Sequence, residues 1–579
     1  MFRILLIITL LLSLLGPLAP GQSSVTPTPA QTKWITDHAI PFKTSEAGQG
    51  FEDLQPLKKL IGNARIVALG EATHGTHEFF QMKHRLTEFL ATEMGFTIFA
   101  MEGNLPEAFR IGDYVRTGQG NPEQLVRGLA FWTWTTEELT NLVKWMRRFN
   151  ESGKGHMQFA GFDMQLPGAA QQNTLAFLRK FDPTLASKAE QTFDAIRDPS
   201  QDFGVVAATI PGAAVAGKHL RYSAWVKTKD VAPATASLFL RAEGKDGLLK
   251  RGSLTGRPPS GTTDWTRYEI EIDVPKETVE IQLGLFMPGQ GTAWMDEARL
   301  EIDGQAYSDA SLDVDFELDR IKGFAPRLKN RPVPRSYQVT LDQEQAHSGK
   351  QSLRLKYVEP KAHEVIAPKK AAQMCREILT EMEKARPAYL KKAGPEEVDW
   401  AIQNARVVYQ SYEWNADDTK YSREVSMADN IKWILDRAPA GSKIVLWAHN
   451  GHINRDPEAL GAILDKRYGR EMVVLGFTAA SGEYNAEKGQ TGIETFSLKA
   501  PPTESIEWYF QSTGWPRLIL DLRPASKDDP ASAWLTKTHD FRFIGTLGTD
   551  DQFAPSIVTQ LYDGLIYFER STASRMLKR

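Results

Sequence analysis

Short apolar runs alternate with segments of helical apolar spacing in two stretches of the chain, before about residue 200 and after about residue 366. In the first stretch the apolar runs are residues 66–69, 97–101 and 157–160. In the second stretch they are residues 443–447, 472–477, 517–522 and 565–568. Strands that alternate with helices in this way predict an α/β fold with a mostly parallel sheet flanked by helices.

Between about residues 202 and 360, apolar and polar residues alternate in short runs, as in 220–226 and 267–272. This period of two, interrupted by turn residues at 256–261, predicts an all-β sandwich. Residues 263–268 and 293–300 resemble the jelly-roll modules of carbohydrate-active and secreted proteins. The segments 315–317 and 347–353, which usually open such modules, come last here. We therefore expect a circularly permuted jelly roll, inserted through termini that lie close together.

The expected organisation is one α/β domain, residues 51–201 and 363–579, split by the sandwich at residues 202–362. Residues 22–50 are rich in Pro, Ser and Thr, which is typical of a linker. Residues 1–21 place Arg3 before an apolar run and small residues, the order of a secretory signal peptide. The run is short for a bilayer span, so we expect export to the periplasm or medium and no stable membrane span, with an uncleaved anchor as the alternative.

Charge and cysteine content exclude several classes of protein. The formal net charge is -3, with 69 basic and 72 acidic residues, which gives no reason to expect a nucleic-acid partner. Cys375 is the only cysteine, so the chain makes no internal disulfide. Its helical surroundings argue against a nucleophilic role.

Charged and imidazole side chains directly follow four of the predicted strands. They are Glu71 and His74, Glu102, Asp163, and His449 and His452. Because the carboxyl ends of parallel strands share one edge of the sheet, we expect these side chains to converge. An imidazole beside a carboxylate is suited to general acid–base chemistry near neutral pH. For Asp163, helix capping is the alternative role.

Three ordered motifs carry a family resemblance: Gly70-Glu71-Ala72-Thr73-His74-Gly75, Phe99-Ala100-Met101-Glu102 and Trp447-Ala448-His449-Asn450-Gly451-His452. With them the sequence resembles the erythromycin esterases. The resemblance implies hydrolysis of a carboxylic ester, in the named enzymes the lactone of a macrolide, with no metal and no other cofactor. It implies that His74 activates water and that Glu71 positions or polarises His74. Glu102 would support the water and the charge balance, and His449 and His452 would bind the substrate carbonyl or tune the acid/base pair.

The resemblance also implies a basic residue in the helix after His74. By direct count this chain has Lys83 where family members can have Arg, and Arg85 lies nearby. Lysine is a point charge and not a planar fork, which weakens the match at this position. The predicted substrate contacts are Lys83, Arg85, Asp163 and Asn450.

Two other functions stay open at this point. The same histidines and carboxylates suit a metal-dependent hydrolase with zinc or manganese, although neither a His-Glu-x-x-His motif nor a cysteine pair supports it. A non-catalytic exported protein could bind glycan through the sandwich. A serine hydrolase is disfavoured, because no Gly-x-Ser-x-Gly elbow follows a predicted strand. The expected partners are a small-molecule ester or lactone and, through the sandwich, a glycan.

Overall fold

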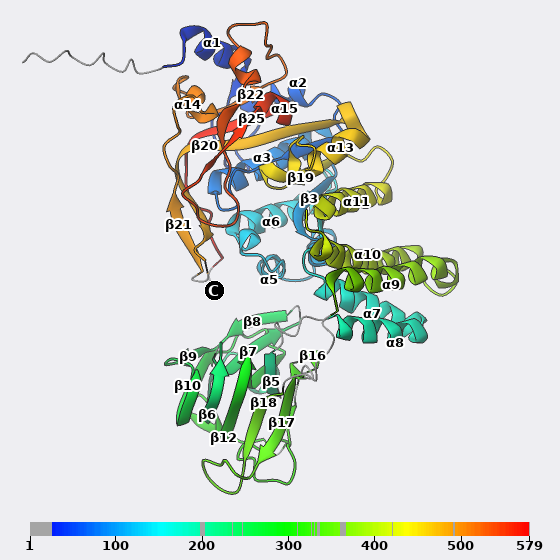
Figure 1. The fold of residues 1–579 in the computed structure, drawn as a ribbon, viewed down its shortest axis with the longest axis vertical. Coiled ribbons are helices and arrows are strands. Elements are labelled where there is room, and N and C mark those ends of the chain that lie inside the picture. Colours follow the sequence, from blue (N-terminus) through cyan, green and yellow to red (C-terminus); the bar gives the residue numbers. More distant parts are fainter. Residues whose placement is uncertain are drawn as a thin grey trace, which may run out of the picture.

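The computed structural model describes residues 26–196 and 203–577, except 234, 246, 310, 326, 329–330, 333–335, 359–365, 420 and 490–491. The predicted signal peptide, residues 1–21, lies outside the described residues. Figure 1 shows an α/β part and, below it, a separate group of strands that runs from β5 to β18. The chain is a mixed α/β protein, as predicted.

The α/β part is built on a nine-stranded sheet with the order β1-β22-β25-β20-β2-β19-β3-β4, to which β21 is added beside β20. The strands from β25 to β4 pair in parallel, whereas β22 and β1 pair in antiparallel fashion at one edge. Their bounds are β1 Ala39–Pro41, β2 Ile66–Leu69, β3 Ile98–Asn104, β4 Gln158–Asp163, β19 Ile444–Trp447, β20 Met472–Glu487, β21 Ile493–Ser497, β22 Arg517–Asp521 and β25 Gly564–Ser571.

Helices cover both faces of this sheet, which is why its central strands are apolar at every position. Val67 and Leu69 pack with α3 (His77–Met94), α6 (Glu137–Glu151) and α2 (Leu57–Ile61), whereas Ile66 and Ala68 pack with α11 (Tyr421–Arg437) and α13 (Leu460–Tyr468). The remaining helices around the sheet are α4 (Leu105–Thr117), α5 (Pro122–Arg127), α12 (Asn450–Ile453), α14 (Ile506–Gln511) and α15 (Val558–Leu561). A small hairpin, β23 (His539–Arg542) and β24 (Phe553–Ser556), lies outside the sheet.

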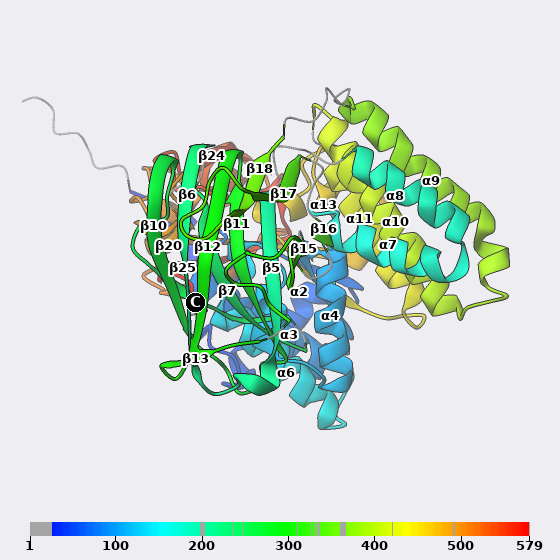
Figure 2. The ribbon, with the colours of Figure 1, turned by 90° about the horizontal axis from the view of Figure 1, so that it is seen from below.

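A layer of helices lies beside the sheet and forms its own apolar core. It contains α7 (Gly168–Phe181), α8 (Pro183–Ala195), α9 (Pro368–Tyr389) and α10 (Pro395–Ala416). Cys375 is buried in this core, and burial raises the pKa of its thiol to about 12, as expected for a packing residue. The strands from β5 to β18 lie between α8 and α9 in the chain, and these two helices lie side by side (Figure 2). The first and last strands of this segment, β5 and β18, also contact each other, so its two ends lie close together.

Residues 203–357 form two antiparallel sheets around a separate hydrophobic core. The seven-stranded sheet has the order β17-β18-β12-β6-β10-β9, with β13 beside β12, and the five-stranded sheet has the order β14-β5-β11-β7-β8. The bounds are β5 Phe203–Pro211, β6 His219–Ala232, β7 Ser237–Gly244, β8 Gly247–Arg251, β9 Ser253–Thr255, β10 Gly261–Asp273, β11 Glu280–Pro288, β12 Gln290–Ile302, β13 Gln305–Tyr307, β14 Phe324–Ala325, β17 Tyr337–Asp342 and β18 Ser352–Tyr357, with a short pair β15 Arg327–Leu328 and β16 Arg331–Pro332.

The prediction of a linker at residues 22–50 is wrong for the part that the structure describes, residues 26–50. Pro29–His38 forms helix α1, which Thr28 and Gln31 cap reciprocally, and Ala39–Pro41 pairs with β22. Trp34 and Ile35 are buried against the sheet, and this apolar packing outweighs the linker-like composition. Within the described residues, no helix has the length and apolarity needed to cross a membrane.

Candidate active site

Two glycines let the loop after β2 pack closely against Asn450 and Asn485. A Cβ on Gly70 would come within 2.0 Å of the Asn450 side chain, and a Cβ on Gly75 within 2.0 Å of the carbonyl oxygen of Asn485. Neither approach leaves room for a larger residue. The glycines at both ends of the Gly-Glu-x-x-His-Gly motif therefore fix the path of the loop that carries Glu71 and His74.

Glu71 is completely buried and is bonded by three side chains. Its Oε1 lies 2.7 Å from Nδ1 of His74, and its Oε2 accepts hydrogen bonds from Nζ of Lys83 at 2.6 Å and Nε1 of Trp447 at 2.8 Å. Burial raises the pKa of Glu71, but the charge of Lys83 and the hydrogen bond with His74 more than offset it, so the net pKa is below its usual value. Glu71 is therefore an anion that accepts a hydrogen bond from His74.

This contact determines the protonation pattern of the His74 ring. With the Nδ1 proton donated to Glu71, the neutral ring carries its lone pair on Nε2. Among the described residues, no hydrogen bond reaches Nε2. The ring packs edge-on against Trp134 at 5.9 Å and lies 4.9 Å from the ring of His449, between centroids. His74 is thus an oriented imidazole with one unengaged nitrogen.

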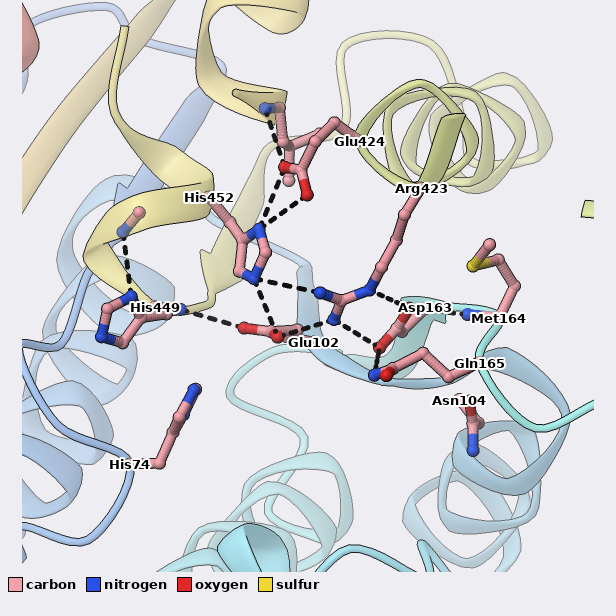
Figure 3. Close-up of polar contacts among 12 residues, drawn as sticks. His74, Glu102, Asn104, Asp163, Met164, Gln165, Arg423, Glu424, His449 and His452 are labelled. Carbon is pink, nitrogen blue, oxygen red and sulfur yellow. Dashed lines mark hydrogen bonds and ion pairs between the residues drawn. The ribbon is translucent and has the colours of Figure 1, made fainter. Parts of the chain in front are cut away.

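A second polar network lies beside His74 at the ends of β3, β4 and β19 (Figure 3). Glu102 accepts hydrogen bonds from the backbone N–H of His449 at 3.0 Å and from Nη2 of Arg423 at 2.8 Å, and it pairs with Nε2 of His452 at 3.2 Å. Burial raises the pKa of Glu102, but the charges of His452 and Arg423 hold it well below its usual value. Figure 3 shows the ring of His74 pointing toward Glu102 and His449.

Arg423 joins Glu102 to Asp163. Its Nη2 and Nε lie 2.9 and 3.2 Å from the two carboxylate oxygens of Asp163, which also accepts the N–H of Met164 and the side-chain amide of Gln165. Burial lowers the pKa of Arg423, but Asp163 and Glu102 raise it further than burial lowers it. The planar guanidinium suits this pair of carboxylates better than a lysine would.

His452 is held between two carboxylates. Its Nδ1 lies 2.9 Å from Glu424, and its Nε2 faces Glu102. Burial lowers the pKa of His452, but Glu102 and Glu424 raise it to about 10. His452 is therefore an imidazolium near neutral pH, and it donates to both carboxylates.

His449 uses both of its ring nitrogens within the protein. Nδ1 accepts the N–H of Gly451 at 3.0 Å, and Nε2 donates to the carbonyl oxygen of Ile544 at 2.9 Å. Burial and the neighbouring His74 and His452 lower the pKa of His449 to about 3, so this ring is neutral. It caps the short helix α12 and forms one wall beside His74.

The four residues predicted as substrate contacts lie in different surroundings, and most of them are outside the polar network. Lys83 is fully buried below Glu71, and burial lowers its pKa to about 8 against the charge of Glu71. Arg85 points to the other side of α3, where it binds Asp53 and two carbonyl oxygens of the segment before α2. Asn450 exchanges two hydrogen bonds with the backbone of Phe477. Of these predicted contacts, only Asp163 belongs to the network in Figure 3.

Arg423 and Glu424 are the site residues that the sequence interpretation did not find. They lie at the start of α11, and the loop that precedes them is far in sequence from every motif. Charged residues at the start of a helix are common on solvent-exposed surfaces, so the sequence carries no signal that sets this pair apart. The only available argument is physical: two buried carboxylates, Glu102 and Asp163, need a cation nearby, and Arg423 supplies it.

The geometry also bears on metal binding. Within the described ranges, no three His, Cys, Asp or Glu side chains are arranged to hold a metal ion. The ring nitrogens of His74, His449 and His452 are already bonded to Glu71, Glu424, Glu102, Gly451 and Ile544, except Nε2 of His74. The donor set thus fits a hydrogen-bonded network better than a metal centre.

The erythromycin esterase family model matches residues 91–224 and 333–571, more than half of the chain. The chain belongs to the erythromycin esterase family. The matched ranges include Glu102, Asp163, Arg423, His449 and His452, and they begin after His74. Membership of this family implies a hydrolase.

Two curated relatives agree with this assignment. An erythromycin esterase type II of Escherichia coli is 33% identical over 162 residues, which are 28% of this chain and 38% of that protein. A putative hydrolase of Bacillus subtilis, YbfO, is 21% identical over 94% of this chain and 92% of its own length. The chain therefore spans well under half of the Escherichia coli protein and nearly all of the Bacillus subtilis one.

Solved structures share the fold. A Bacillus cereus protein aligns with a TM-score of 0.59 and 20% identity over 95% of this chain and all of its own. A mutant of the erythromycin esterase EreC in its open conformation aligns with a TM-score of 0.51 and 12% identity over 92% of this chain and 96% of its own. At these identities the likeness establishes the fold alone.

Proposed function

We propose that this protein hydrolyses a carboxylic ester or lactone with water that His74 activates. The observation that carries the proposal is the Glu71–His74 pair, with 2.7 Å between Oε1 and Nδ1 and an unengaged Nε2 on the other side of the ring. An imidazole fixed in this tautomer is ready to take a proton from water. Membership of a family of hydrolases supports the same reaction class.

In the proposed reaction, Nε2 of His74 removes a proton from water while the oxygen attacks the ester carbonyl carbon. The imidazolium that forms is stabilised by the anionic Glu71. Negative charge develops on the carbonyl oxygen, and the positive charges of His452 and Arg423 in the neighbouring network would stabilise it electrostatically. Collapse of the intermediate breaks the bond to the leaving alkoxide, which takes the proton from His74.

The remaining assignments belong to this proposal. Residues 1–21 would direct export to the periplasm or medium. The divided catalytic domain would comprise residues 51–201 and 363–579 together with α1 and β1, which pack on the same sheet. Residues 202–362, which include the two antiparallel sheets, would be the inserted, circularly permuted jelly roll. Macrolides are one candidate substrate class, because EreC and the Escherichia coli relative carry the name erythromycin esterase.

The proposal is tested by incubating the purified protein with a panel of aryl esters, lactones and macrolides and measuring the addition of one water by mass spectrometry. Reaction in heavy-oxygen water should place the label in the carboxylate product. If none of these substrates gains water, ester hydrolysis at this site is wrong.

The metal-dependent alternative has its own measurement. Turnover that persists after exhaustive chelation, with no metal found by elemental analysis, would exclude it. Activity lost on chelation and restored by zinc or manganese would instead replace the proposed mechanism.

A further inference from the structure

The outward face of the seven-stranded sheet carries tryptophans that the sandwich core does not require. On β6, Tyr222, Ala224 and Val226 point into the core, so Trp225 lies on the opposite face. Trp265 on β10 is half-buried, and it too is outside the core cluster of the described residues. Core packing therefore does not explain these indoles, and half-exposed aromatic clusters on a polar sheet face are typical of binding sites.

His347 joins the two indoles into one group, which we call the aromatic corner (Trp225, Trp265 and His347). The imidazole stacks on Trp225 with 3.9 Å between ring centroids, and Trp265 meets it at 69° and 5.8 Å. Nδ1 of His347 is bonded to Glu297 at 2.8 Å, and its backbone N–H donates to the buried Asp296. Three segments far apart in sequence thus hold the corner rigidly.

The charges around the aromatic corner are balanced and partly exposed. Lys227 is bonded to Asp264 at 3.1 Å, and Asp264 is 86% exposed. Glu297 pairs with His347, and Arg299 lies 4.0 Å from Glu297. Paired charges leave no net field for a strongly charged ligand, but they offer donors and acceptors to hydroxyl groups.

We propose that the aromatic corner binds a pyranose unit of a glycan. A sugar ring has an apolar C–H face that packs on an indole and equatorial hydroxyls that pair with neighbouring polar groups. Trp265 supplies the packing face, because Trp225 is covered by His347. Asp264, Lys227 and Glu297 supply the hydrogen-bonding groups. The contact of the sandwich with α5 is made by β8 of the other sheet, so the corner is separate from the catalytic site (Figure 1).

The test uses the full chain in affinity electrophoresis through gels that contain laminarin, xylan, mannan or dextran, followed by calorimetry with the polysaccharide that retards it. We expect at least one polysaccharide to retard the protein and Trp265→Ala to weaken that binding at least about tenfold. Trp265→Tyr, which keeps an aromatic face, should retain most of it. Trp515→Ala, which removes a half-buried indole of the α/β part, is the matched control.

Two results would overturn the proposal. One is the absence of retardation by all four polysaccharides together with no binding on a printed glycan array. The other is unchanged binding by a folded Trp265→Ala variant. Ester turnover should be the same in Trp265→Ala and the unmodified protein, so this test is independent of the proposed hydrolase activity.

Discussion

The loop after β2 and the loop after β19 lie on the same sheet edge, and each places a histidine within 4.9 Å of the other, between ring centroids. His74 contacts one carboxylate and keeps Nε2 unengaged, whereas His449 spends both nitrogens on backbone groups. Two histidines from the family motifs therefore have different roles, although they lie side by side. Hydrogen-bond saturation distinguishes the residue that can exchange a proton from those that build its surroundings.

The first prediction tests the unengaged ring directly. His74→Ala removes the only histidine of the described site with an unengaged nitrogen, so ester turnover should fall by about 10²–10⁴-fold, the usual contribution of general base catalysis. Initial rates with the best substrate of the panel measure the loss. His156→Ala changes an exposed histidine and should leave the rate unchanged. A folded His74→Ala protein with full activity would place the chemistry elsewhere.

The second prediction concerns the saturated network. Arg423→Ala leaves the buried carboxylates of Glu102 and Asp163 without their shared cation, so the α/β part should lose about 3–5 kcal/mol of stability. Urea unfolding followed by circular dichroism measures it. Arg423→Lys keeps the charge but loses the fork, and it should lose less stability.

An exposed ion pair provides the control for the loss of the buried Arg423 ion pairs. Arg116→Ala breaks an ion pair whose arginine side chain is 66% exposed, and it should change stability by less than about 1 kcal/mol. Equal effects of Arg423→Ala and Arg116→Ala would mean that the network contributes nothing to stability.

The third prediction separates the two roles of Glu71. Glu71→Gln removes the anion that orients His74 and leaves Lys83 buried without its counter-charge, so it should lower the rate by about 10²-fold and destabilise the protein. The double variant Glu71→Gln with Lys83→Met removes both charges. It should recover much of the stability but not the rate, because His74 still lacks its carboxylate. Recovery of the rate would show that Glu71 acts only by neutralising Lys83.

The sequence predicts the sheet edge and its convergent residues, because strand-end motifs in a parallel sheet are brought together by topology alone. It identifies Glu71, His74, Glu102 and Asp163 for this reason. It misses Arg423, which lies on a helix in another layer. It also predicts Arg85 as a substrate contact, whereas the Arg85 side chain binds Asp53 on the other side of α3. Side-chain direction on a helix and the partner of a buried charge are tertiary properties, which motif spacing does not contain.

The last prediction uses pH to separate His452 from His449. The pKa of His452 is raised to about 10, above its value in an unfolded chain near 6.5. A raised pKa contributes stability that is fully present below pH ~6.5 and is lost as the pH rises through about 10. His452→Gln should therefore be less stable than the unmodified protein at pH 6, and this gap should shrink steadily toward pH 10.

His449→Gln is the control. It should show no such alkaline trend, because burial lowers the pKa of His449 to about 3 and its ring is neutral throughout this range. Melting temperatures of the three proteins across the same buffers measure the trend. A pH-independent gap for His452→Gln would mean that the ring is neutral and that Glu102 and Glu424 do not hold an imidazolium between them.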